Sequence, residues 1–275
     1  MTSIALSFAQ PILVFLSPPV HAESLDSDEG PIYDVRFVAN NIIPPLCGHG
    51  ILATTKAICC GMLPGISQDA VRKPIVKFRT SKSIVSARAL VPGEKAVTAD
   101  GEFYEIVLPS CVVKEVEEAE KADIQKMVAK ALRTDADKVG VKYLAHEYGG
   151  DRLMVVLDPS EYLEGRDVDI NAFLTGRFTT YTLTHATPGR KTAFVSRSFM
   201  PYTGILEDHV CGIAHALMTP YYVTQPDVDV VAGKEAFVRQ VSPRGGDLWV
   251  TLDEDKGVVK LRGNAKLFAK GEVTI

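Results

Sequence analysis

Two Cys-Gly dipeptides stand where apolar helices are expected to begin. They are Cys47-Gly48 and Cys211-Gly212, and each follows a loop that contains proline and opens a segment with small residues in its first turns. The first N–H groups of a helix have no partner inside the helix, and the helix dipole is positive at that end. If both helices point into one cleft, they form two facing anion sites suited to a carboxylate substrate.

The two cysteines are themselves candidates for acid–base chemistry. A thiol at the amino end of a helix has a lowered pKa, so Cys47 and Cys211 could act as opposed acid and base on the two faces of a carbon acid, as in a two-base racemase. The alternative is that both are small buried apolar residues, which is common for free cysteines. Both interpretations stay open at this point.

Two further titratable residues lie beside the helix starts. The helix dipole disfavours a charged imidazole at His49, so we expect a neutral ring that exchanges protons near pH 7, with a hydrogen-bonded capping role as the alternative. Asp208 lies just before the second helix, where an aspartate often serves as an N-cap worth about 1 kcal/mol. Because the two roles are compatible, both residues are candidates for proton transfer.

The same segments contain residue types that bind zinc, namely Cys47, His49, His209, Cys211 and His215. Their spacing does not fit a structural zinc site, in which paired ligands are usually two to four residues apart on a compact knuckle. His215 lies about one turn into the second helix, where a buried core histidine is the expected role. We therefore expect no bound metal.

The spacing of apolar residues predicts the elements that position the first of these sites. Residues 32–38 alternate like a strand and 40–45 form a loop. A helix over 48–62 is apolar on all sides, which places it inside a core, and Pro64-Gly65 ends it. Short alternating stretches between 75 and 108 predict an antiparallel meander around this helix.

The pattern recurs beyond a charge-dense run at 115–121. An amphipathic helix is predicted over 122–133, a loop over 201–208, a nearly uncharged helix over 212–222 and a turn over 240–246. The expected strands cover residues 139–147, 152–157, 179–185, 193–197, 248–252, 258–261 and 267–275.

The sequence therefore predicts an α+β fold of two similar halves. Each half, 1–115 and 116–275, would be a curled, mostly antiparallel sheet around a central helix, with the active-site cleft between them. The last strands are candidates for crossing back to the first half. The recurrence of Cys-Gly in the same context points to an internal duplication.

Composition restricts the classes of function and location. The chain has 275 residues, 46% of them hydrophobic, which excludes a mostly disordered chain, a collagen and a coiled coil. Its net charge of -4 and the absence of a run of about 20 apolar residues argue against nucleic acid and membrane partners, and favour a small molecule. Five cysteines cannot all pair within one chain, so we expect a reducing, cytoplasmic location. Residues 1–22 resemble a secretory signal without its basic residues, which leaves secretion as the alternative.

At this point the sequence resembles the PhzF (phenazine biosynthesis-like) family, which shares its fold with diaminopimelate epimerase and proline racemase. The resemblance runs from about residue 32 to 275 in the order and spacing of the family. The matching segments are Pro45-Leu-Cys-Gly-His49, Phe194-Val-Ser-Arg197, Gly204-Ile-Leu-Glu-Asp208, Val210-Cys-Gly-Ile-Ala-His215, Arg239-Gln240, Arg244-Gly-Gly246 and Val259-Lys-Leu-Arg-Gly263.

The resemblance implies a cofactor-free isomerase that transfers a proton on a small carboxylate-bearing metabolite, with no metal. His49 and Asp208 would be polar active-site residues. Gly48 and the backbone of Gly212 and Ile213 would line the site of the substrate carboxylate. The family often has serine at the position of Ile213, so this chain lacks a hydroxyl donor there.

The amino end departs from the family pattern. Family members begin with a strand, a Gly-Asn-Pro turn, a helix and a Ser-Glu-Thr segment whose glutamate is the acid–base residue. Here residues 7–14 can be laid on that segment, which places Gln10 at the glutamate position, and an amide cannot take up a proton near neutral pH. The chain is then a truncated or divergent member that only binds ligands, or its proton transfers have moved to Asp208, His49 and the two cysteines. An exposed sheet edge at a shortened amino end would favour a homodimer.

Overall fold

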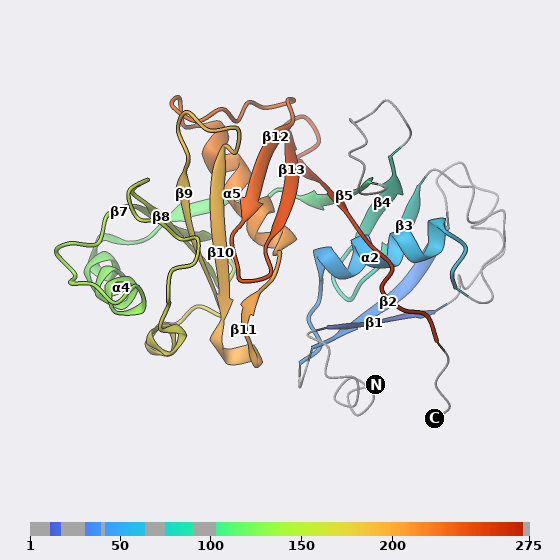
Figure 1. Cartoon of the computed structure of the whole chain (residues 1–275), viewed down its shortest axis with the longest axis horizontal. Helices are drawn as coiled ribbons and strands as arrows, with labels where there is room; N and C mark the ends of the chain where they lie inside the picture. Colours follow the sequence, from blue (N-terminus) through green and yellow to red (C-terminus); the bar gives the residue numbers. More distant parts are fainter. Residues whose placement is uncertain (1–11, 18–30, 40–41, 64–74, 91–102, 272–275) are drawn as a thin grey trace.

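The strands of the structure, a computed structural model, join into one large curled sheet (Figure 1). The structure describes residues 12–17, 31–39, 42–63, 75–90 and 103–271. Across the sheet the strands follow the order β1 (Leu13–Ser17), β2 (Ile32–Val38), β3 (Val76–Arg79), β4 (Ile84–Ala89), β5 (Phe103–Pro109), β14 (Val258–Asn264), β13 (Gly246–Asp253), β12 (Ala236–Gln240), β10 (Phe194–Met200), β9 (Thr180–Ala186), β8 (Arg152–Leu157), β7 (Val141–Glu147) and β6 (Val113–Glu115), and β11 (Ile205–Asp208) pairs with β10.

Most neighbouring strands are antiparallel, as the meander pattern predicts. Three pairs are parallel: β2 with β3, β8 with β9, and β10 with β12. The last strand of the sheet, β14, pairs with β5 from Val258 opposite Pro109 to Asn264 opposite Phe103. One ladder thus joins the early and late parts of the chain. The division into 1–115 and 116–275 stays a prediction.

Two buried helices, α2 (Gly48–Cys59) and α5 (Gly212–Val223), lie inside the curl of the sheet (Figure 1). Ile51 and Ile58 of α2 and Leu217 of α5 are fully buried in the same apolar core. Such burial is the dominant stabilising contribution for elements of this kind. The predicted α+β class, with curled sheets around central helices, is confirmed.

The end of α2 comes earlier than the predicted residue 62. Gly61 has a φ of 62°, a left-handed conformation that glycine adopts without a steric penalty. The N–H of Gly61 donates to the carbonyl of Ile58, and the N–H of Met62 donates to that of Ala57. These bonds form a Schellman motif, which ends the helix. The expected stop at Pro64-Gly65 lies outside the described residues.

The third long helix, α4 (Glu118–Ala131), covers a second apolar cluster built on β7, β8 and β9 (Figure 1). Ile124 and Val128 face this cluster. The helix begins four residues before the predicted 122, because Glu118 and Glu120 in its first turn suit the positive end of the helix dipole. The later part of the charge-dense run, from Glu118, is therefore the first turn of this helix.

Two predicted segments are wrong. The loop over 201–208 contains a short 3-10 helix, Pro201–Thr203, and the strand β11, which pairs with β10 after a left-handed turn at Gly204. Residues 267–271 form no strand: they have no partner in the described sheet, and Phe268 is fully exposed. Residues 272–275 of that predicted strand lie outside the described part.

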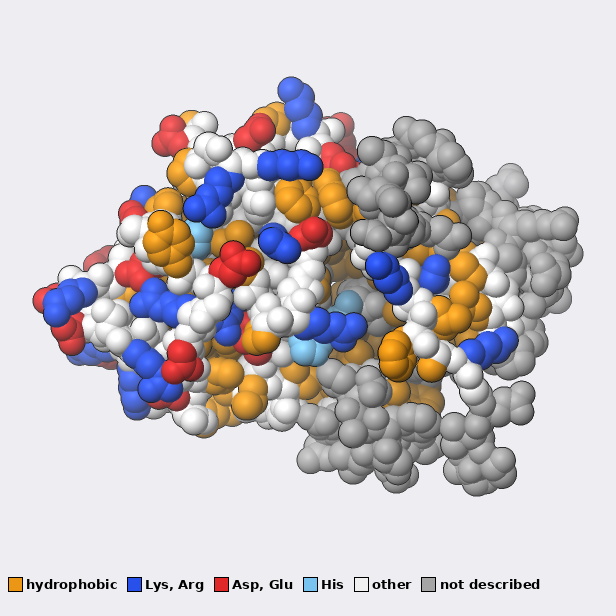
Figure 2. Space-filling view, viewed as in Figure 1, with side chains coloured by type: hydrophobic (Ala, Val, Ile, Leu, Met, Phe, Trp, Pro, Cys, Tyr) orange, Lys and Arg blue, Asp and Glu red, His pale blue; other side chains and the backbone are white. Residues whose placement is uncertain are grey.

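The face drawn in Figure 2 carries acidic and basic side chains interspersed with apolar ones. On its described residues there is no broad area of Lys and Arg alone. Among the described helices, none has the length and apolar character needed to cross a membrane. The absence of a nucleic acid partner stays a prediction.

Candidate active site

The amino ends of α2 and α5 touch at two glycines. A Cβ built on Gly48 would lie 3.2 Å from the Cα of Gly212, and a Cβ on Gly212 would lie 3.4 Å from the Cα of Gly48. At Gly48 the nearest atom is backbone, so a larger residue there would push the helix starts apart slightly, whereas at Gly212 the nearest atom is Cδ1 of Leu261 at 3.3 Å. The close approach brings the positive ends of two helices to one place.

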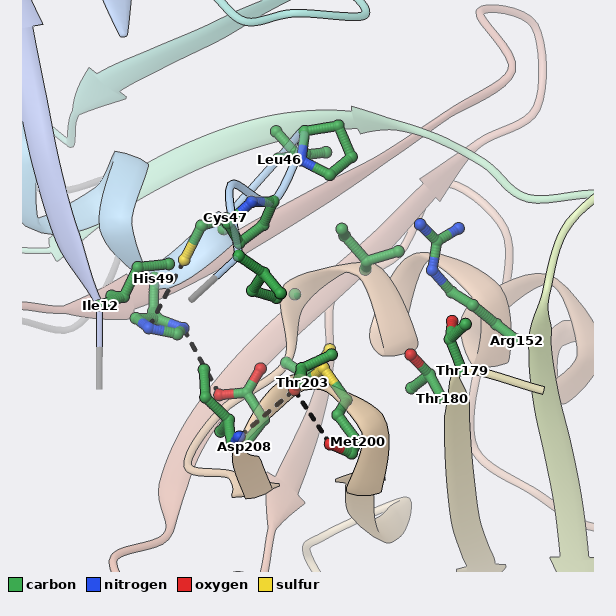
Figure 3. Close-up of a pocket in the computed structure, with 18 of the residues that line it drawn as sticks. Ile12, Leu46, Cys47, His49, Arg152, Thr179, Thr180, Met200, Thr203 and Asp208 are labelled. Carbon is green, nitrogen blue, oxygen red and sulfur yellow. Dashed lines mark hydrogen bonds and ion pairs between the residues drawn. The ribbon is translucent and has the colours of Figure 1, made fainter. Parts of the chain in front are cut away.

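A cavity of about 500 Å³ opens over this contact (Figure 3). All seven residues that the sequence singled out line it, although they come from two segments far apart in the chain. These residues are Cys47, Gly48, His49, Asp208, Cys211, Gly212 and Ile213. The structure therefore brings the candidates together in one cavity, and their individual roles stay predictions.

His49 bridges the two helix starts. Its Nδ1 lies 3.6 Å from Oδ1 of Asp208 and 3.2 Å from the carbonyl oxygen of Val210, and its Nε2 lies 3.5 Å from Sγ of Cys47 (Figure 3). The His49 side chain is 38% exposed and that of Asp208 is 12% exposed. The imidazole at the start of α2 and the carboxylate before α5 thus meet at the cavity.

Asp208 does not cap α5. The N-cap of that helix is Cys211, and Asp208 instead accepts a hydrogen bond from the N–H of Val210 at 3.3 Å. Its carboxylate closes the short turn that precedes the helix and faces His49. The N-cap interpretation is therefore wrong, because the cap lies three residues later. The Asp208 carboxylate instead lies beside the cavity.

The pKa of His49 is raised from 6.5 to about 9. Burial alone lowers this pKa, but the hydrogen bond and electrostatic interaction with Cys47, followed by the interaction with Asp208 and the hydrogen bond to the carbonyl of Val210, more than compensate. The neutral ring expected from the helix dipole is therefore wrong at pH 7, where the imidazole is protonated. The dipole is outweighed by Cys47, two residues away in the sequence, and by Asp208, which only the fold brings beside the ring.

The two cysteines differ in their surroundings. Burial, and then the negative charge of Asp208, raises the pKa of the Cys211 thiol well above its usual range. The lowered pKa expected for this helix-end thiol is therefore wrong, and the Cys211 thiol stays protonated. Cys47 is equally buried, but its Sγ contacts the imidazole of His49.

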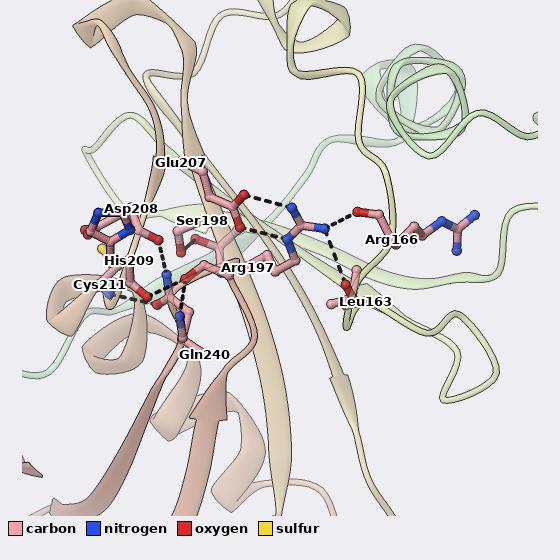
Figure 4. A network of polar contacts seen from close by, with 12 residues as sticks. Leu163, Arg166, Arg197, Ser198, Glu207, Asp208, His209, Cys211 and Gln240 are labelled. Carbon is pink, nitrogen blue, oxygen red and sulfur yellow. Dashed lines mark hydrogen bonds and ion pairs between the residues drawn. The ribbon is translucent and has the colours of Figure 1, made fainter. Parts of the chain in front are cut away.

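A buried amide holds the start of α5. Gln240, at the end of β12, is fully buried and makes two hydrogen bonds to the backbone of the segment before α5 (Figure 4). Its Oε1 accepts from the N–H of Cys211 at 2.7 Å, and its Nε2 donates to the carbonyl of Asp208 at 2.6 Å. In the sequence, Gln240 stands out only as part of the Arg239-Gln240 segment, and nothing there indicates this role.

A second buried network holds β11, the strand that ends at Asp208. Arg197 on β10 donates from Nε and Nη2 to the two carboxylate oxygens of Glu207 at 2.7 and 2.8 Å (Figure 4). The same guanidinium donates to the carbonyls of Leu163 and Arg166. Such a two-pronged pair fixes orientation as well as position. Together with Gln240 it fixes the backbone that carries Asp208.

The opposite end of the cavity is lined by Arg152, Thr179 and Thr180 (Figure 3). These residues fall in predicted strands, and their types and spacing predict no role for them. They meet because β8 and β9 are parallel, with Arg152 opposite Thr180. No local spacing in the sequence marks this juxtaposition.

No three His, Cys, Asp or Glu side chains converge as a metal site within the described residues. His215 is fully buried in α5, and burial lowers its pKa to about 4. Its Nδ1 lies 2.8 Å from the carbonyl of Cys211, which matches the expected core role. Gln10, the nearest match to the family glutamate, lies outside the described residues.

Comparison with known proteins gives consistent similarities. The sequence model of the PhzC-PhzF family, described as phenazine biosynthesis-like protein, matches residues 1–271. Phenazine biosynthesis-like domain-containing protein 1 of Mus musculus is 30% identical over 239 residues, which cover 84% of this chain and 73% of the mouse protein. A protein of Pseudomonas aeruginosa named an uncharacterized isomerase is 30% identical over 125 residues, 46% of this chain and 44% of that one.

A solved structure has the same fold. It is a PhzF family protein of Enterococcus faecalis, with a TM-score of 0.68 and 24% identity, covering 100% of this chain and 86% of that chain. At this identity the likeness concerns the fold alone.

Proposed function

Because this chain belongs to the phenazine biosynthesis-like (PhzC-PhzF) family, we propose that it is a cofactor-independent isomerase acting on a small carboxylate-bearing metabolite. The observation that carries the proposal is the meeting of two helix starts, a carboxylate and an imidazole in one cavity of about 500 Å³. A relative that is named an isomerase supports the same class of activity.

The substrate carboxylate would bind at the touching helix starts. The backbone N–H groups of Gly48, Gly212 and Ile213 belong to first turns, where no partner is available within the helix. Two helix dipoles add their positive ends at this point, which favours an anion over a neutral group. A carboxylate held here also withdraws electrons from the adjacent carbon and makes its proton more acidic.

Asp208 and His49 would handle the proton. The Asp208 carboxylate would accept a proton from the substrate carbon, and the protonated His49 would return one at another carbon. A pKa of about 9 keeps His49 charged at neutral pH, so it serves as the acid in this direction. The protonated Cys211 thiol can only donate, and Cys47 would set the charge of His49.

A binding or interaction protein with the same fold is the second candidate. The observation that favours it is Gln10 at the nearest match to the family's Ser-Glu-Thr glutamate, since an amide cannot serve as a base. In this case the cavity would bind a carboxylate without turnover.

Location and assembly are further proposals. All five cysteines are free, which fits a reducing compartment such as the cytoplasm. The end strand β1 gives the described sheet an edge at which a second copy could pair, so we propose a homodimer.

Solvent exchange separates an isomerase from a binding protein. The protein is incubated in deuterated water with a panel of 2-amino and cyclohexadienyl carboxylates, and deuterium at carbon is measured by mass spectrometry. We expect exchange that Asp208→Asn abolishes and that Asp123→Asn, an exposed aspartate on α4, preserves. Ligand-induced melting shifts without exchange for any compound would contradict the isomerase and support the binding protein.

A further inference from the structure

The cavity has a second polar end, away from the helix starts. Arg152 opens β8 and Thr180 opens the neighbouring parallel strand β9, where the two residues are in register. Both line the cavity, together with Thr179 (Figure 3). None of the residues to which the proposed reaction assigns a role lies at this end, so its polar groups need a separate explanation.

Only part of the hydrogen-bonding capacity of the Arg152 guanidinium is satisfied within the described residues. Its Nη1 pairs with Oε2 of Glu147 on β7, and both side chains are 22% exposed. Within the described part of the chain, this is the one hydrogen-bonding partner that the guanidinium has. A guanidinium carries five N–H donors in a planar fork, so its remaining edge can take a carboxylate.

The charge of Arg152 also acts on the chemical end of the cavity. It counteracts, in part, the raised pKa of Cys211 at the start of α5. Two acidic side chains lie near it: Glu147, which it pairs with, and Asp151, which accepts a hydrogen bond from the Thr179 hydroxyl at 2.6 Å. Asp151 is thus engaged elsewhere, and Glu147 is the direct competitor for any ligand of Arg152.

We propose that Arg152 binds a second acidic group of the substrate, so that the cavity selects small dicarboxylic acids over monocarboxylic acids. This rests on the proposed function in placing the first carboxylate at Gly48 and Gly212. The second carboxylate would then extend toward β8 and β9, where the fork of Arg152 binds it. A cavity of about 500 Å³ has room for a molecule of this size.

The test compares glutarate with pentanoate, which match in chain length and differ by one carboxylate. Calorimetric titration of the wild-type protein should give an affinity for glutarate at least about tenfold higher than for pentanoate. In Arg152→Gln the two affinities should become equal, with that for pentanoate unchanged. Arg239→Gln removes a surface guanidinium that pairs with Asp247, and it should retain the preference.

Glu147→Gln sharpens the test because it should change the affinity for glutarate in the opposite direction to Arg152→Gln. Removing the competing carboxylate should raise the affinity for glutarate and leave that for pentanoate unchanged. Arg152→Lys keeps the charge without the fork, so an intermediate preference is expected. If Arg152→Gln does not fold, these two variants decide the question.

Three results would overturn the inference. The first is an equal loss of affinity for glutarate and pentanoate in Arg152→Gln, and the second is the absence of a preference for glutarate in the wild type. The third is an affinity for glutarate that neither the Arg152 variants nor Glu147→Gln change. Binding is measured without turnover, so an absence of deuterium exchange together with an Arg152-dependent preference would reject only the isomerase. Deuterium exchange in the wild type together with equal affinities for glutarate and pentanoate would reject only the second site.

Discussion

The starts of α2 and α5 meet at one cavity and share a Cys-Gly pair, yet they are built differently. The start of α5 is fixed by the buried amide of Gln240 and carries the apolar Ile213 after its Cys-Gly pair. The start of α2 has His49 at the same position, and this side chain is 38% exposed. One end is therefore held rigidly, and the other carries a group that can change its charge.

The paired cysteines show the same divergence. Both precede a glycine at the helix start and both are buried. Burial, and then the nearby carboxylate of Asp208, favours the neutral thiol of Cys211, whereas Cys47 lies beside the imidazole of His49. Equivalent positions at two helix starts therefore do not give the two thiols the same surroundings.

The largest expected effect is on turnover at the position where the helices differ most. His49→Gln should lower the rate of deuterium exchange at least about a hundredfold, since a positioned acid contributes about that much or more. Ile213→Val, at the equivalent position of α5, should change it less than about threefold. The comparison fails if both variants lose activity equally, because the imidazole would then have no special part.

The next effect is on stability at the start of α5. Gln240→Met keeps the size of the side chain but leaves the N–H of Cys211 and the carbonyl of Asp208 without partners, so the free energy of unfolding in urea should fall by about 2 kcal/mol. His49→Gln serves as the α2 counterpart. With both variants measured at pH 10, where the wild-type ring is already neutral, it should alter this free energy by less than about 0.5 kcal/mol. Similar losses in the two variants would contradict the division into a fixed end and a titrating end.

The smallest effect is on the titration of His49, which NMR can follow. A pKa near 9 is expected, and Cys47→Ala should lower it more than Asp208→Asn, because Cys47 contributes most to raising it. Since the folded pKa lies above the ordinary value of 6.5, the charged ring stabilises the fold fully below pH 6.5, and this is lost as the pH rises through 9. An unaltered pKa in Cys47→Ala would remove the thiol from this account.

The sequence sufficed for features carried by local spacing. Apolar residues on all sides of α2 and α5 predicted buried helices, and the Cys-Gly pairs marked their starts. It did not suffice for Gln240 and Arg152, which reach the site from β12 and β8 through the order of strands in the sheet. The predicted neutral ring of His49 was wrong mainly because the ring contacts the thiol of Cys47, two residues away, and secondly because the fold brings Asp208 beside it.

The central claim is that two helix starts form one carboxylate site, and an amide titration tests it most directly. Addition of pentanoate to the 15N-labelled protein should shift the amide resonances of Gly48 and Gly212 together, with a single dissociation constant. A response at only one of these glycines, or two separate constants, would contradict the claim.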